Sequence, residues 1–166
     1  MSLNDEEKTA RSFGQHVFLK VASIRPECSP DGKVSALMPQ LEYKNQKRLP
    51  LHKYGGGSFC KFQIKRTLVC QGVYILTEND KVMRVGECVN LSSRFNDGYG
   101  QIAPRNCYKG GQRSNCMVNN LILRSGQKGN EIILWFYRTE GYRAIRKAIE
   151  SELIVQFRPP WNLSAV

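Results

Sequence analysis

Residues 71–86 read QGVYILTENDKVMRVG, and this stretch decides the fold. Residues 72–76 are rich in β-branched and aromatic side chains, as strands are, and residues 81–86 form a second strand-like run. The polar residues 78–80 between them are typical of a turn. The two runs therefore predict an antiparallel hairpin.

The sequence after this hairpin predicts further helices and one more strand. Asn90 is a good N-cap for a short helix, and Ser114 can cap a second helix that ends near Gly126. Residues 131–138 form a third, more buried strand, and a long helix follows over residues 141–157. The order predicts an α/β (α+β) protein built on a small three-stranded antiparallel sheet flanked by helices.

The net charge favours a polyanionic partner. The chain has 25 Lys and Arg against 14 Asp and Glu, which gives a net charge of +11 and an isoelectric point near 9.6. Cationic side chains that neutralise phosphates release counterions, so a basic protein of this kind is suited to nucleic acid. The alternative is a soluble basic protein without such a partner.

The chain contains no apolar run of the roughly 20 residues needed to cross a bilayer. Residues 1–7 are acidic and lack the layout of a signal peptide, so we expect no membrane association and a cytoplasmic protein. In that reducing setting the cysteines are expected to be free thiols that pack as small apolar side chains. A zinc site is the weaker alternative, since no CxxC pair is present. The six cysteines are Cys28, Cys60, Cys70, Cys88, Cys107 and Cys116.

The last predicted helix contains an acidic residue in an apolar arc. The apolar stripe is formed by Tyr142, Ile145, Ile149, Leu153 and Phe157. Glu150 projects inside this arc, where a carboxylate is costly unless it meets a cation, a metal ion or several donors. Arg146, one turn earlier, also falls within the arc. An ion pair between Glu150 and Arg146 and a catalytic role for Glu150 are both consistent with this pattern.

Five short blocks, in order, resemble the GIY-YIG nuclease domain. The blocks are Gly72-Val73-Tyr74, Arg84-Val85-Gly86, Asn90-Leu91 with Arg94, Glu150 with Leu153-Ile154, and Pro159-Pro160-Trp161-Asn162. Each block alone is a weak match, but their order and spacing over about residues 70–163 agree with that family. The resemblance implies a small nuclease fold and hydrolysis of phosphodiester bonds.

The resemblance also implies roles for single residues. Tyr74 is expected to be the general base, or the relay to it, for the attacking water. Arg94 is expected to hold the scissile phosphate. Glu150 is expected to bind one divalent cation per active site, Mg²⁺ with Mn²⁺ as a substitute.

One block departs from the family pattern. The second tyrosine of the family is replaced by Arg84, which cannot be a base but can act electrostatically on Tyr74. Similar restriction enzymes also place a basic residue there; the alternative is a loss of catalysis. Tyr99 is expected in the same cleft, where it bonds phosphate or water or simply packs. Residues expected to have structural roles are Gly72, Gly86 and Asn162.

The loop at residues 98–115 mixes cations, amides and an aromatic residue. Such side chains read base edges and contact phosphates, although a mobile surface loop is the alternative. The candidate nucleic-acid-binding residues are Arg105, Asn106, Tyr108, Lys109, Gln112, Arg113 and Asn115.

The N-terminal part of the chain is predicted to be a separate, β-rich extension. Residues 1–12 suggest a short helix or a frayed end, and residues 16–21 and 59–64 are strand-like. We expect residues 1–68 to contact DNA or to form a dimer interface, and residues 69–166 to form the nuclease domain.

The leading hypothesis is a metal-dependent endonuclease that cleaves double-stranded DNA at specific sites, like a restriction enzyme. It acts either as a homodimer or as a monomer that cuts twice. One alternative is a nuclease of repair, recombination or mobile elements that recognises DNA structure. The other is a non-catalytic nucleic-acid-binding module that lost activity at Arg84.

Overall fold

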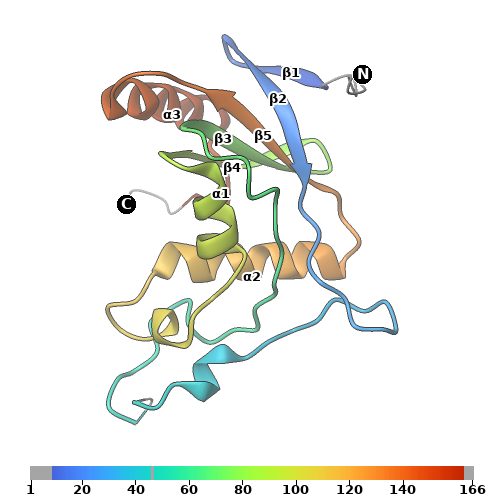
Figure 1. Cartoon of the computed structure of the whole chain (residues 1–166), viewed down its shortest axis with the longest axis vertical. Coiled ribbons are helices and arrows are strands. Elements are labelled where there is room, and N and C mark those ends of the chain that lie inside the picture. Colours follow the sequence, from blue (N-terminus) through green and yellow to red (C-terminus); the bar gives the residue numbers. More distant parts are fainter. Residues whose placement is uncertain (1–8, 46, 163–166) are drawn as a thin grey trace.

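The computed structural model describes residues 9–45 and 47–162 and shows one five-stranded antiparallel sheet with helices on both faces (Figure 1). The strands have the order β1-β2-β5-β3-β4. They are β1 (Ala10–Phe13), β2 (His16–Ser23), β3 (Gly72–Glu78), β4 (Lys81–Cys88) and β5 (Ile132–Arg138). The helices are η1 (Pro39–Glu42), α1 (Leu91–Ser93), η2 (Arg94–Tyr99), η3 (Pro104–Cys107), α2 (Arg113–Gln127) and α3 (Arg143–Phe157).

The predicted class is correct, but the expected three-stranded sheet is too small. β3, β4 and β5 form the predicted centre, and β2 pairs with the free edge of β5, with Leu19 opposite Phe136. β1 then pairs with β2. The expectation of a helix or frayed end over residues 1–12 is wrong for residues 10–12, which belong to strand β1; residues 1–8 lie outside the described part of the chain.

Two apolar layers hold the helices on the sheet. On one face, Val73 and Ile75 of β3 pack in a buried cluster with Leu153 of α3. On the other face, Tyr74 of β3 lies in a cluster with Ile122 of α2. The alternation follows from the two-residue period of a strand, which directs successive side chains to opposite faces.

The segment between β2 and β3 runs along the side of α2 that faces away from the sheet (Figure 1). The side chain of Asn119 in α2 accepts a hydrogen bond from the backbone nitrogen of Cys60 (2.8 Å) and donates one to its carbonyl (2.8 Å). These bonds replace the ladder of a strand, and the expected strand over residues 59–64 is therefore wrong: only Phe59 forms an isolated bridge, with Leu37.

The helix boundaries differ from the predicted ones at their N-terminal ends. Asn90 caps α1 as expected, because its side chain accepts a hydrogen bond from the nitrogen of Ser93. Ser114 does not cap α2, which begins one residue earlier at Arg113. α3 begins at Arg143, two residues after the predicted start, because Gly141 has a positive φ of 90° that a helix cannot contain.

The cysteines are free, as expected, and Cys60, Cys88, Cys107 and Cys116 are buried. Within the described residues, no helix is both long and apolar enough to cross a membrane.

Candidate active site

Tyr74 and Gly86 are cross-strand partners in the β3–β4 hairpin. The phenol of Tyr74 lies directly over Gly86: a Cβ atom on residue 86 would be 2.2 Å from the tyrosine hydroxyl oxygen. Any larger residue would displace the ring, because real side-chain contacts are never this short. Glycine at position 86 therefore makes room for the Tyr74 side chain, which is fully buried.

The Tyr74 hydroxyl belongs to a buried group of phenols and guanidinium groups. Its oxygen lies 2.6 Å from the hydroxyl oxygen of Tyr99, which comes from the end of η2. Arg84 of β4 donates a hydrogen bond from Nε to the Tyr99 hydroxyl (3.1 Å) and another from Nη1 to the carbonyl of Trp161 (2.8 Å). Asn119 of α2 holds the backbone of Tyr99 in place by donating a hydrogen bond to its carbonyl (2.7 Å).

Arg94 completes this group. Its Cζ atom lies 4.9 Å from the centre of the Tyr99 ring, within the range of a cation–π contact. Burial alone would lower the pKa of Arg94, but Tyr74 and Tyr99 outweigh it and raise the pKa, so the guanidinium stays charged. Its Nε atom is buried and has no hydrogen-bond partner. A buried donor without a partner is costly in free energy, so this Nε atom can accommodate an additional acceptor.

Burial governs the protonation of Tyr99. It raises the pKa of this phenol, and the nearby Tyr74 raises it further, whereas Arg84 and Arg94 act in the opposite direction without reversing the shift. Tyr99 is therefore a neutral phenol at neutral pH in the free protein.

A cleft of about 650 Å³ lies beside this group, and Arg94 is the member of the group that lines it. Its walls are formed by Glu87, Cys88, Val89, Asn90, Ser93, Arg94, Asp97, Gly98, Gln112, Asn115, Arg143 and Arg146. Both long helices begin at this cleft, α2 after Gln112 and α3 at Arg143, and neither has a side-chain N-cap. The N-terminal ends of helices carry partial positive charge, so the cleft is suited to an anion.

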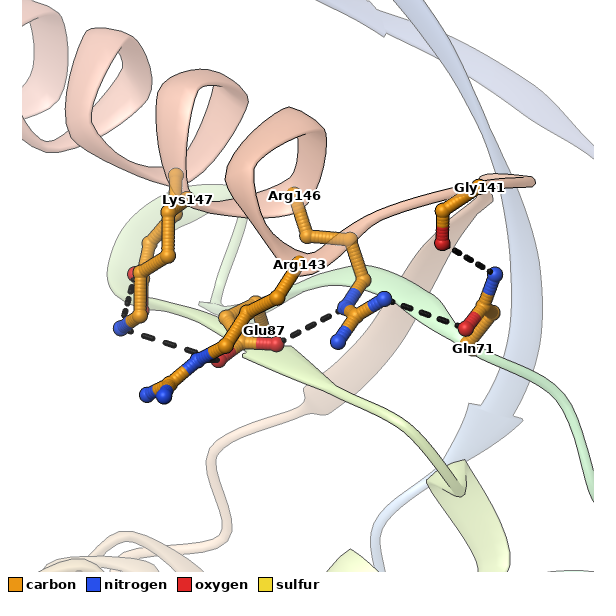
Figure 2. Close-up of polar contacts among 7 residues, drawn as sticks. Gln71, Glu87, Gly141, Arg143, Arg146 and Lys147 are labelled. Carbon is orange, nitrogen blue, oxygen red and sulfur yellow. Dashed lines mark hydrogen bonds and ion pairs between the residues drawn. The ribbon is translucent and has the colours of Figure 1, made fainter.

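Glu87 lies at the edge of the cleft and was not predicted from the sequence. Its carboxylate oxygen Oε2 accepts a hydrogen bond from Arg146 Nε at 2.9 Å, and Oε1 lies 3.4 Å from Arg143 Nε and 3.7 Å from Lys147 Nζ. Figure 2 shows these three cations reaching from α3 towards the one carboxylate. Arg146 also donates to the side chain of Gln71 (3.1 Å). The network joins the end of β4 to the first turns of α3.

Glu150 lies next to this network. Its carboxylate oxygen Oε2 is 2.8 Å from Lys147 Nζ, and its side chain is 14% exposed. The alternative ion pair between Glu150 and Arg146 is wrong, because Arg146 bonds with Glu87 and Gln71 instead. Glu150 is not part of the lining of the cleft in the described residues, and Lys147 links it to Glu87.

The candidate nucleic-acid-binding residues separate into three positions. Gln112 and Asn115 line the cleft beside Arg94 and bond to each other through their side-chain amides. Arg113 lies over the ring of Tyr54 (5.7 Å), away from the cleft lining. Arg105 and Lys109 are exposed and Asn106 is half-buried.

Tyr108 does not fit a role in contacting nucleic acid. Its side chain is buried and packs with Phe59, and its hydroxyl donates a hydrogen bond to the carbonyl of Gln40 (2.6 Å). The ring therefore fastens the segment between β2 and β3 to the loop before α2.

Gly72 and Asn162 occupy tight positions around β3 and β4. A Cβ atom on residue 72 would lie 2.2 Å from the carbonyl oxygen of Tyr137. Asn162 accepts a hydrogen bond from the nitrogen of Val85 (3.0 Å) and donates one to its carbonyl (2.9 Å). These two bonds fasten the end of the chain's described part to the outer edge of β4.

The fold is an α+β fold with a five-stranded antiparallel sheet between helices. A glutamate-to-alanine mutant of bacteriophage T4 EndoII has a similar structure, with a TM-score of 0.50 and 15% sequence identity. The match covers 88% of this chain and 92% of that chain. It therefore extends beyond residues 69–166 into the N-terminal part of the chain. No protein-family model matches the sequence, and no curated protein is similar to it.

Proposed function

We propose that this protein is an endonuclease that hydrolyses phosphodiester bonds of double-stranded DNA in the cleft beside Arg94. The cleft is lined by three arginines, Arg94, Arg143 and Arg146, and by two carboxylates, Glu87 and Asp97. The observation that carries the proposal is the buried Nε atom of Arg94, which has no hydrogen-bond partner. A phosphate oxygen is the acceptor that satisfies it, with a charge-assisted bond. The fold shared with EndoII supports the same reading.

In this proposal Arg94 has two positions. In the free protein its guanidinium covers the ring of Tyr99. When a phosphate enters the cleft, the guanidinium turns towards it, stabilises the charge that develops on its oxygens, and uncovers the phenols. One phenol of the Tyr74–Tyr99 pair loses its proton to solvent, and Arg84, held by the carbonyl of Trp161, stabilises the phenolate. The phenolate then takes the proton of the attacking water and becomes a phenol again.

Glu150 is the proposed ligand for one divalent cation, Mg²⁺ or Mn²⁺. Its carboxylate is largely shielded from water and holds a cation already, the ammonium group of Lys147. A hard divalent cation prefers such a carboxylate oxygen, with water and phosphate as its other ligands. When bound, the cation supplies Lewis-acid activation of the phosphate.

Gln112 and Asn115 favour site-specific cleavage over recognition of DNA shape. Both side-chain amides line the same cleft as Arg94, and amides of this kind pair with the edge of adenine. We therefore propose a restriction-like enzyme, acting as a homodimer or as a monomer that cuts each strand in turn. A non-catalytic binding module is the second candidate, because Arg84 stands where a tyrosine is expected.

A cleavage assay on plasmid DNA of known sequence tests the proposal. We expect discrete fragments with Mg²⁺ or Mn²⁺ and none with EDTA, and we expect Arg94→Gln to abolish cleavage. A smear or single nicks would point to a nuclease without sequence preference or one that recognises DNA structure. Binding of the plasmid without cleavage under any divalent cation would leave the binding module as the correct reading.

A further inference from the structure

The first turns of α3 contain a group of cations that no acidic residue of the helix's own first turn neutralises. Arg143, Arg146 and Lys147 all lie near its N-terminal end, and its first turn contains no acidic residue. Positive side chains at this end of a helix are unfavourable, since the helix dipole is positive there too. Of the described residues, Glu87 is the one carboxylate within ion-pair distance of all three.

The three cations differ in how firmly Glu87 holds them. Arg146 has a 2.9 Å hydrogen bond, and its side chain is 4% exposed. Arg143 and Lys147 are at 3.4 and 3.7 Å, and their side chains are 73% and 47% exposed. Arg146 therefore serves as the fixed partner of the carboxylate. The contacts of Arg143 and Lys147 with Glu87 are the longer ones, and both can break without exposing a buried charge, while Lys147 keeps its 2.8 Å contact with Glu150.

The position of this group relates it to the proposed active site. Arg143 and Arg146 line the same cleft as Arg94, on the wall made by α3. Figure 2 shows the guanidinium group of Arg143 extending beyond Glu87, away from Arg146. An extended anion that occupies the Arg94 position therefore continues past the Arg143 side chain.

We infer that Arg143 and Lys147 form a second phosphate-binding subsite, which contacts a backbone phosphate of the DNA next to the one held by Arg94. This inference rests on the proposed function. In the free protein Glu87, which lines the cleft, takes the place of the phosphate and holds both side chains near its own carboxylate. When the DNA strand enters, Arg143 and Lys147 exchange the carboxylate for the phosphate, while Arg146 stays with Glu87. Phosphate contacts of this kind fix the position of the strand rather than read its sequence.

The salt dependence of DNA binding tests this subsite. A short fluorescent DNA duplex is titrated in EDTA, so that no cleavage occurs, at a series of salt concentrations. Each lost phosphate contact lowers the slope of log K against log salt by about 0.9. We expect Arg143→Gln to lower the magnitude of this slope by the equivalent of one phosphate contact. The double variant Arg143→Gln/Lys147→Gln should lower it by the equivalent of up to two contacts.

Lys128→Gln is the matched control. Lys128 is exposed and follows α2 at the end of the helix opposite to the cleft. That distance is about 20 Å along the helix, so the control should keep the slope of the parent protein. Because Arg143 and Lys147 are exposed, both variants should keep the melting temperature of the parent.

The possible outcomes separate the inference from the proposed function. If the parent binds the duplex and the double variant retains its salt slope, the subsite is wrong and the proposed function stands. If the parent does not bind the duplex at any salt concentration, the proposed function is wrong and the subsite falls with it. An equal loss of affinity at all salt concentrations, with an unchanged slope, would make Arg143 and Lys147 structural residues and also overturn the subsite.

Discussion

The hydroxyl oxygens of Tyr74 and Tyr99 lie 2.6 Å apart, although the two residues are separated by the β3–β4 hairpin and the η2 turn. Both rings are fully buried, and the bond between them links the centre of the sheet to the wall of the cleft formed by η2. The nearest cations are Arg84, which donates to Tyr99, and Arg94, which covers its ring. The hydroxyl proton of one phenol therefore lies between the two oxygens, and either residue can be its donor.

The phenol pair predicts a specific effect on the rate of cleavage. Tyr74→Phe and Tyr99→Phe should each lower kcat by about 10²–10⁴-fold, the usual contribution of a general base. The affinity for DNA should change little, because neither side chain lines the cleft. Single-turnover cleavage and DNA binding measure the two effects separately. Tyr137→Phe, a half-buried tyrosine of β5, is the control; a full rate for Tyr74→Phe would exclude the phenol pair as the base.

Gly86 provides a test of how the Tyr74 ring is positioned. Gly86→Ala places a methyl group against the Tyr74 hydroxyl and should destabilise the protein by about 1–3 kcal/mol through overpacking. Cleavage should fall as well, because the displaced phenol loses its bond to Tyr99. Urea denaturation measures the free energy of unfolding. Gly56→Ala is the matched control, since nothing lies within 4 Å of a Cβ atom there; an equal effect of both changes would contradict the packing argument.

The resemblance to the GIY-YIG domain implied the grouping of Tyr74, Arg84 and Arg94, and local structure explains why these residues meet. A tight hairpin sets Tyr74 opposite Gly86, and a helix capped by Asn90 follows directly. Strand alternation and capping rules define these positions without knowledge of distant contacts. The number of strands in the sheet could not be predicted from local patterns. Pairing of β2 with β5 joins residues more than a hundred positions apart, and no local pattern specifies that register.

Glu87 shows what sequence reasoning missed and which signal was present. Because side chains alternate along β4, Glu87 lies on the same face as Val85, which packs in the cluster under α3. A carboxylate on a buried face requires a cation, and Arg146 is the cation inside the apolar arc of α3. The carboxylate of Glu87 and the guanidinium group of Arg146, each on an otherwise apolar face, therefore neutralise each other. The pattern of residues 141–157 alone was consistent with Glu150 as the partner of Arg146 or as a catalytic residue, and it contains no information about the contact with β4.

The ion pair between Glu87 and Arg146 predicts an asymmetric effect on stability. Glu87→Gln leaves the buried Arg146 charge without its carboxylate and should lower the free energy of unfolding by about 3 kcal/mol. Arg146→Met should cost less, about 1 kcal/mol, because Glu87 keeps Arg143 and Lys147 as partners. Chemical denaturation of both variants gives the comparison. A larger cost for Arg146→Met would show that the arginine packs rather than pairs.

Glu87 also predicts a loss of stability in acid. Burial alone would raise its pKa, but the hydrogen bond from Arg146 and the charges of Lys147, Arg146 and Arg143 together lower it below its ordinary value. A carboxylate with a lowered pKa stabilises the fold above the pKa of the unfolded chain, about 4.3, and this contribution is lost as the pH falls through the lower folded value. Thermal melts between neutral pH and strongly acidic pH should therefore show a decline that Glu87→Gln reduces. An identical decline in that variant would assign the acid sensitivity to other carboxylates.

Lys147 predicts a competition for Glu150. The ammonium group is 2.8 Å from the carboxylate that we propose as the cation ligand, so a divalent cation has to displace it. Lys147→Met removes this competitor and should tighten the binding of Mn²⁺ in the absence of DNA by about tenfold, the factor that corresponds to 1.4 kcal/mol. Electron paramagnetic resonance of free Mn²⁺ measures the affinity without reference to cleavage. Adding Glu150→Gln to the same variant should abolish the gain. If Lys147→Met binds Mn²⁺ no better than the parent, or if the gain survives Glu150→Gln, the cation is held elsewhere and Glu150 serves only to fix Lys147 on α3.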